Sequence, residues 1–223
     1  MQNAIMCSMI KSHYEKVIAD CADKAQLCVV TKKRSIEEIL PFYDAGERIF
    51  GENHASELTE KAKQMPSDIR WQFIGHLQRN KVRQILPYVD CIQSLDSTEL
   101  AAVIEKECIR INRTVDVFAE FHLADEDTNK TGLDAADAVS FVTALKDFPH
   151  LHLSGIMAMG PHTDDKERIR EVFMQAKDLF EMLKQEFPAE DIHTLSMGMS
   201  HDYGVALECG SNMVRIGSYL FTE

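Results

Sequence analysis

The residue with the clearest chemical potential is Lys32, which directly follows an apolar run. The run Leu27–Thr31 has the valines and the β-branched threonine typical of a short buried strand, so Lys32 comes where that strand ends. A lysine amine forms Schiff bases when it is neutral, and burial or a neighbouring cation lowers a lysine pKa. Lys33 and Arg34 supply such cations. A solvated basic turn is the simpler interpretation of these three residues alone.

Polar side chains recur at the ends of later predicted strands. They are Asn53, His76, Lys130, Ser200 and Arg215. In a parallel α/β fold the carboxyl ends of the strands share one face, which is where such folds place their functional groups. These side chains are therefore expected to meet Lys32 at one site.

Two glycine-containing turns could bind an anion. Gly198-Met199-Ser200 links a predicted strand to a helix, and its backbone N–H groups and hydroxyl suit a phosphate group. Gly217-Ser218, after the last predicted strand, offers further close backbone donors. Loops after the seventh and eighth strands often bind phosphate in (β/α)₈ barrels. A plain helix N-cap at Ser200 explains the first turn equally well.

Other chemistries have weaker support. Ser200 has His201 and Asp202 beside it, but adjacent residues cannot form a catalytic triad, and the second glycine of a GxSxG turn is displaced. The six cysteines form no CxxC pair, and the histidines have no recognised metal-ligand spacing. The sequence therefore predicts neither a metal site nor a disulfide framework.

Eight apolar runs alternate with helical patterns, and a further helix over residues 5–23 precedes the first run. The predicted strands cover residues 27–31, 48–53, 70–74, 91–95, 115–123, 151–159, 194–197 and 213–217. No linker interrupts this alternation, which favours an α/β fold with a single (β/α)₈ TIM barrel over residues 1–223. There is little room for a helix after the eighth strand, so the N-terminal helix is expected to cover that side. An open doubly wound sheet is the alternative, because alternation alone does not establish closure.

The composition excludes several classes of partner. A net charge of −12 and a pI near 5.2 argue against nonspecific binding to nucleic acid or to an anionic membrane. No apolar run approaches the roughly 20 residues of a membrane span, and the N-terminus lacks the features of a signal peptide. We expect a cytoplasmic protein that is monomeric.

Several segments, in order along the chain, resemble one family. They are Lys32 after its strand, Phe50-Gly51-Glu52-Asn53, the long run from Trp71 to Lys81, Leu195–Ser200 with its SMGMS motif, and Val214–Gly217. These segments are similar to those of the pyridoxal phosphate homeostasis proteins, also known as the YggS-like or proline synthetase co-transcribed group. The resemblance covers about residues 25–222.

The resemblance implies a barrel similar to the N-terminal domain of alanine racemase, with pyridoxal 5′-phosphate (PLP) held as a Schiff base on Lys32. By the family pattern, Ser200 and the backbone of Gly217-Ser218 hold the phosphate, Arg215 lies by the pyridine nitrogen and keeps it unprotonated, and Asn53 lies near the lysine and the ring. His76 and Met199, within the matched motifs, are also expected at the cofactor.

The family has no established enzymatic activity. It is taken to buffer, carry or deliver PLP, with effects on amino-acid and vitamin B6 balance, and PLP-dependent apoenzymes are the partners implied. A PLP-dependent amino-acid racemase or lyase is the alternative, although this chain has no room for the second domain that brings alanine racemase its second acid/base. An interaction protein that uses the basic residues from Arg79 to Arg83 is a third option.

The chain departs from the family pattern in three places. Lys33 raises the question of which amine forms the Schiff base, and His201 stands where an acidic residue is common. The run Leu220–Glu223 stops short of the usual Phe-Gly continuation, which predicts that the last helix is absent.

Overall fold

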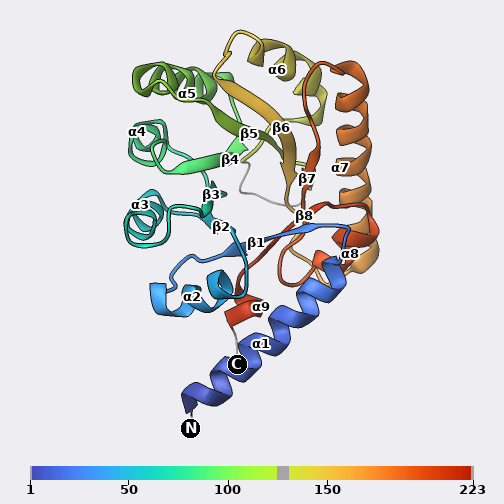
Figure 1. The fold of residues 1–223 in the computed structure, drawn as a ribbon. Helices are drawn as coiled ribbons and strands as arrows, with labels where there is room; N and C mark the ends of the chain where they lie inside the picture. Colours follow the sequence, from blue (N-terminus) through green and yellow to red (C-terminus); the bar gives the residue numbers. More distant parts are fainter. Residues whose placement is uncertain (1, 125–130, 222–223) are drawn as a thin grey trace.

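The computed structural model describes residues 2–124 and 131–221, with the backbone alone for residues 2–11. Eight parallel strands form a closed barrel in sequential order, and helices surround it (Figure 1). The strands are β1 (Gln26–Val30), β2 (Ile49–Glu52), β3 (Arg70–Phe73), β4 (Val89–Leu95), β5 (Val115–Phe121), β6 (Leu151–Ala158), β7 (Thr194–Ser196) and β8 (Met213–Ile216). This is the (β/α)₈ TIM barrel that the sequence predicted.

The helices follow the strands as expected, with small differences at their ends. They are α1 (Gln2–Cys21), α2 (Ile36–Asp44), α3 (Ala55–Gln64), α4 (Val82–Ile85), α5 (Thr98–Ile111), α6 (Ala138–Leu145), α7 (Lys166–Glu186), α8 (Tyr203–Glu208) and α9 (Ser218–Phe221), with 3₁₀ turns η1 (Arg79–Lys81) and η2 (Ala135–Asp137). The helix predicted after Gly198 begins only at Tyr203. The intervening residues form a turn, in which the Asp202 N–H donates to the carbonyl of Met199.

Pairing between the first and last strands excludes the open sheet. β1 and β8 are parallel, and their register runs from Gln26 opposite Met213 to Val29 opposite Ile216. Helix α1 packs beside the pair β1 and β8. Its His13 ring stacks on Tyr219 of α9 at a centroid distance of 4.5 Å. The N-terminal helix therefore covers the side after β8, as predicted. The prediction that the last helix is absent was wrong, since α9 forms one short turn directly after β8.

Alternation along β1 separates two cores. Leu27 and Val29 pack in the large core between the strands and the helices. Cys28 instead lies inside the barrel, in a small buried cluster to which β1, β2, β4, β5, β6 and β8 each contribute one side chain. The side chains of a strand point alternately to its two faces, so the residues at the end of β1 divide in the same way. This division decides which lysine after β1 can reach the barrel interior.

No helix within residues 2–124 and 131–221 is both long enough and apolar enough to cross a membrane.

We expect Gly155→Ala to destabilise the barrel at the seam between β6 and β7. A Cβ there would lie 2.4 Å from the Thr194 carbonyl oxygen and 3.0 Å from the Phe118 ring, so the backbone of one strand must move. Such overpacking costs about 1–3 kcal/mol. Gly204→Ala is the matched control, since a Cβ meets nothing within 4 Å there and alanine favours the helix. Equal free energies of unfolding for the two variants in urea would contradict this account.

Candidate functional site

The carboxyl ends of the strands enclose a cavity of about 320 Å³. Its wall combines apolar side chains with a lysine, an arginine, a histidine and two serines. The lining residues are Val30, Lys32, Asn53, Ile74, Met157, Met159, Met199, Ser200, His201, Arg215, Gly217 and Ser218. Among the described residues, the structure therefore brings together every residue predicted for the site except His76.

His76 lies in an adjoining hollow of about 260 Å³, which shares Asn53 with the main cavity and also contains His54 and Lys81. Its imidazole is about half exposed, and its Nδ1 lies 3.5 Å from Oδ2 of Asp96. A contact between His76 and a cofactor stays a prediction, because this side chain does not line the cavity of Lys32. Lys130 lies outside the described residues.

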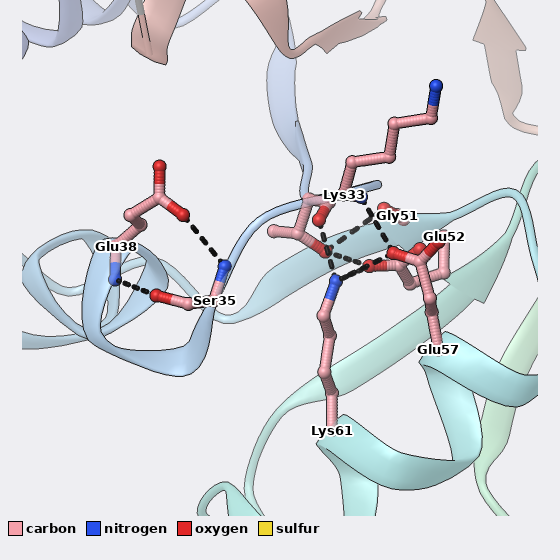
Figure 2. A network of polar contacts seen from close by, with 8 residues as sticks. Lys33, Ser35, Glu38, Gly51, Glu52, Glu57 and Lys61 are labelled. Carbon is pink, nitrogen blue, oxygen red and sulfur yellow. Dashed lines mark hydrogen bonds and ion pairs between the residues drawn. The ribbon is translucent and has the colours of Figure 1, made fainter.

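A buried polar network holds the chain just before Lys32 (Figure 2). The Thr31 hydroxyl donates to Oε1 of Glu52 at 2.6 Å. The Lys61 amine donates to the same carboxylate oxygen at 2.5 Å and to the Thr31 carbonyl at 2.7 Å. Glu52 and Thr31 are fully buried, so these charges and dipoles are shielded from water. The peptide that joins Thr31 to Lys32 is therefore held by β2 and α3.

The next residue turns the chain, so the two adjacent lysines point in different directions. Lys33 has φ +60°, and its N–H donates to Oε2 of Glu57 at 2.6 Å. Its side chain points away from the Lys61 amine (Figure 2), and Lys32, not Lys33, lines the cavity. The charge of Arg34 is paired with Glu38 at 3.0 Å. Arg34 is thus engaged with a carboxylate rather than being an isolated cation beside Lys32.

Local sequence explains why a helix starts directly after this turn. Ser35 is the N-cap of α2, and its hydroxyl accepts from the N–H of Glu38. The Glu38 carboxylate accepts from the N–H of Ser35 in return (Figure 2). This capping box stabilises the first turn of α2 and limits the loop after β1 to a few residues.

Arg215 projects from β8 into the barrel and is held there by other strands. Its Nη1 donates to the carbonyl and the hydroxyl of Ser196, at 2.8 and 2.7 Å, and its Nη2 donates to the Ala158 carbonyl at 3.0 Å. The hydroxyl of Ser196 in turn donates to Gln93, which bonds to Gln72. Burial lowers the pKa of Arg215 from its ordinary value. An arginine has more N–H donors than these bonds use, so it can also bind a group in the cavity.

The opposite part of the cavity suits an anion. A Cβ at Gly217 would lie 3.0 Å from the Val30 carbonyl oxygen, so a glycine lets the end of β8 pass close to β1. The Ser200 hydroxyl accepts from the Tyr219 N–H at 3.2 Å, which leaves the hydroxyl proton for an anion. The Met199 N–H donates to Oδ1 of Asp202 at 2.5 Å, so it stabilises the turn and is not a donor for the anion.

Asn53 contributes an unsatisfied polar atom. Its Oδ1 is buried and has no hydrogen-bond partner among the described residues. Buried polar atoms are rarely left unpaired, and an exception at a cavity wall indicates a place for a polar ligand. His201, beside Ser200, was not among the predicted contacts, although its place next to the SMGMS motif is a signal for it.

Glu120 is a buried carboxylate that the sequence analysis did not single out. It belongs to β5 and is only 3% exposed. Burial raises its pKa to about 7, the charge of Asp96 adds to this, and the charge of Arg215 opposes it. In the sequence Glu120 alternates with apolar residues in the same set as Asp116 and His122, so nothing set it apart from a polar outer face. Glu52 and Lys61 were missed as supports of Lys32, because each is separated from it along the chain.

The comparisons with known proteins agree with this site. The family model described as "Alanine racemase, N-terminal domain" matches residues 5–223, so the chain belongs to that family. Within it, the chain is 36% identical over 199 residues to the pyridoxal phosphate homeostasis protein of Pasteurella multocida, covering 88% of this chain and 85% of that protein. It is 35% identical over 201 residues to the one from Helicobacter pylori, covering 89% and 87%. The chain is therefore a member of the pyridoxal phosphate homeostasis proteins, as the sequence motifs predicted.

Solved structures give the same result. PipY of Synechococcus elongatus, determined without PLP, has a TM-score of 0.90 at 29% identity, covering 96% of this chain and all of that one. The structure of PipY with PLP bound has a TM-score of 0.87 at 28% identity, with the same coverage. An alanine racemase from Clostridium difficile has a TM-score of 0.81 at 13% identity over 97% of this chain and 57% of that one, a likeness of fold.

Removing the Lys61 amine should lower the free energy of unfolding, because this amine holds the backbone before Lys32. Lys61→Met keeps the aliphatic stem but leaves the buried Glu52 carboxylate without its cation, and breaking such a pair costs about 3–5 kcal/mol. Lys63→Met on the exposed face of the same helix is the control and should cost well under 1 kcal/mol. Denaturant unfolding measures both, and a similar small loss in the two variants would show that the pair contributes little.

The raised pKa of Glu120 predicts a pH dependence of stability. The folded protein holds this proton up to about pH 7, whereas the unfolded chain releases it near 4.5, so stability falls as the pH rises between these values. Glu120→Gln removes this loss. The variant should match the wild type near pH 4.5 and exceed it by up to about 3 kcal/mol at pH 8. Unfolding at several pH values tests this, with the exposed Glu60→Gln as control; parallel profiles for Glu120→Gln and the wild type would refute it.

Proposed function

We propose that this chain binds PLP in the cavity of about 320 Å³, with Lys32 as the residue that forms a Schiff base with it. The observation that carries the proposal is the shared cavity itself. It combines a lysine amine, a buried arginine and the Ser200, Gly217 and Ser218 group in the wall of one partly open cavity. The homeostasis proteins related to the chain, and PipY in its PLP-bound structure, support the same ligand.

The residues present fit this cofactor in several independent respects. PLP needs an amine for its aldehyde, donors for its phosphate and a partner for its ring nitrogen. Lys32, Ser200 with the backbone of Gly217-Ser218, and Arg215 offer these groups in turn. The unpaired Oδ1 of Asn53 is the atom that a bound polar molecule would satisfy.

The Lys32 amine can form the covalent bond to PLP without a further reactant. When PLP is bound, the amine of Lys32 would condense with its aldehyde and release one molecule of water. The buried network at Thr31 holds the backbone of Lys32 while its side chain reaches the ring. The Ser200 hydroxyl and the close backbone of Gly217 hold the phosphate, which fixes the aldehyde relative to the amine.

Arg215 favours a carrier over an enzyme. A guanidinium only donates hydrogen bonds, so a ring nitrogen beside it must accept, which it does when unprotonated. PLP supplies an electron sink to its enzymes, and an unprotonated ring is a weaker sink. We therefore propose a noncatalytic, single-domain, monomeric protein that buffers PLP and delivers it to PLP-dependent apoenzymes, with effects on amino-acid and vitamin B6 balance.

The adjacent lysines provide the test of the Schiff base. With PLP added, the wild type should show the absorbance band of a Schiff base, and borohydride reduction followed by peptide mass mapping should place the adduct on Lys32. Lys32→Arg keeps the charge and should abolish band and adduct. Lys33→Asn is the matched control, since asparagine tolerates the positive φ of that position, and should retain both.

The outcomes separate the alternatives. An adduct on Lys33 would move the site out of the cavity and refute the assignment of Lys32. The loaded protein should not exchange the α-proton of amino acids in deuterated water. Exchange that Lys32→Arg abolishes would replace the carrier with a racemase or lyase.

A further inference from the structure

His201 occupies a place at the anion-binding part of the cavity that the proposed function does not use. Its ring lines the cavity beside Ser200, Gly217 and Ser218, and about half of the side chain is exposed. The position follows Ser200 directly, in the turn before α8. An imidazole here is close to any phosphate that the serine and the two backbone groups hold.

The neighbouring Asp202 gives this imidazole a specific electrostatic role. The carboxylate is fully buried, and its Oδ1 accepts the Met199 N–H. Its Oδ2 has no hydrogen-bond partner among the described residues and lies 3.4 Å from Nε2 of His201. A buried carboxylate close to a phosphate site would repel the phosphate unless a cation lay between them. His201 is that cation when it is protonated.

Few other charged groups surround the imidazole in the part of the chain that the structure describes. The His162 ring, from the segment after β6, lies edge-on to it at a centroid distance of 6.4 Å. Lys32 after β1 and Arg215 on β8 share the cavity. Lys32 keeps its amine toward a ligand that forms no Schiff base, and its side chain is exposed. Arg215 is bonded to Ser196 and Ala158. His201 is the imidazole of this cavity wall, and imidazole is the side-chain type that changes charge near neutral pH.

We propose that His201 makes a proton-dependent contact with the phosphate of the ligand, so that this site binds phosphorylated pyridoxine-type compounds more tightly as the pH falls toward 6.5. The inference rests on the proposed function and adds a regulation to it. A phosphate dianion favours the protonated imidazole, so binding takes up a proton. Affinity then decreases as the pH rises. The phosphate itself loses its second proton near pH 6, so the comparison belongs above that value.

The experiment uses two probes that cannot form a Schiff base. Pyridoxine 5′-phosphate carries the phosphate without an aldehyde, and pyridoxine lacks both. Calorimetric titration at pH 6.5, 7.5 and 8.5 gives their affinities, and two buffers with different ionisation enthalpies give the proton uptake. The variants are His201→Gln and, as matched control, His152→Gln, an exposed histidine at the amino end of β6.

We expect His201→Gln to bind pyridoxine 5′-phosphate about tenfold more weakly than the wild type at pH 6.5 and within about twofold at pH 8.5, with its proton uptake lost. Pyridoxine should bind equally to both, and His152→Gln should behave as the wild type. An unchanged pH slope and proton uptake in His201→Gln would overturn the role of His201 alone. A wild type that binds neither phosphorylated probe nor PLP would overturn the proposed function, and the inference with it.

Discussion

The ion pair between Lys61 and Glu52 is the interaction on which the proposed site depends. Two charges are removed from water, and this is favourable only when their remaining hydrogen-bonding atoms are also satisfied. Thr31 supplies part of that satisfaction through its hydroxyl and its carbonyl, whereas Oε2 of Glu52 has no hydrogen-bond partner among the described residues. The same bonds join the end of β1 to β2 and α3. The bonds that stabilise the buried lysine and glutamate therefore also fix the backbone that carries Lys32.

Local charge, not net charge, describes the cavity. The chain carries a net charge of −12, yet the cavity wall contains Lys32, Arg215 and His201. Their carboxylate neighbours are buried one layer away: Asp202 behind His201, and Glu120 inside the barrel, where its raised pKa favours the neutral form. A chain with a negative net charge can therefore still bind a phosphate group, because the side chains of the cavity wall set the local charge.

Much of the site could be predicted from the chain, and the exceptions have a common cause. Lys32 and Ser200 follow predicted strands, Asn53 and Arg215 lie in the last part of theirs, and parallel strands bring their ends to one face. His76 also follows a strand, but its side chain turns into the adjoining hollow and pairs with Asp96. Strand position determines the face of the barrel on which a residue lies, whereas the conformation of its loop determines where the side chain points.

The sequence by itself determined the features that arise from nearby residues. These are the eight strands and their helices, and the candidate lysine at the end of the first strand. Periodicity and capping act over a few residues, so they can be read along the chain. Only the tertiary structure decided closure between β1 and β8, the place of Lys32 rather than Lys33 in the cavity wall, and the pairing of His201 with Asp202. Closure and side-chain burial depend on contacts between distant segments, and burial sets the cost of each charge.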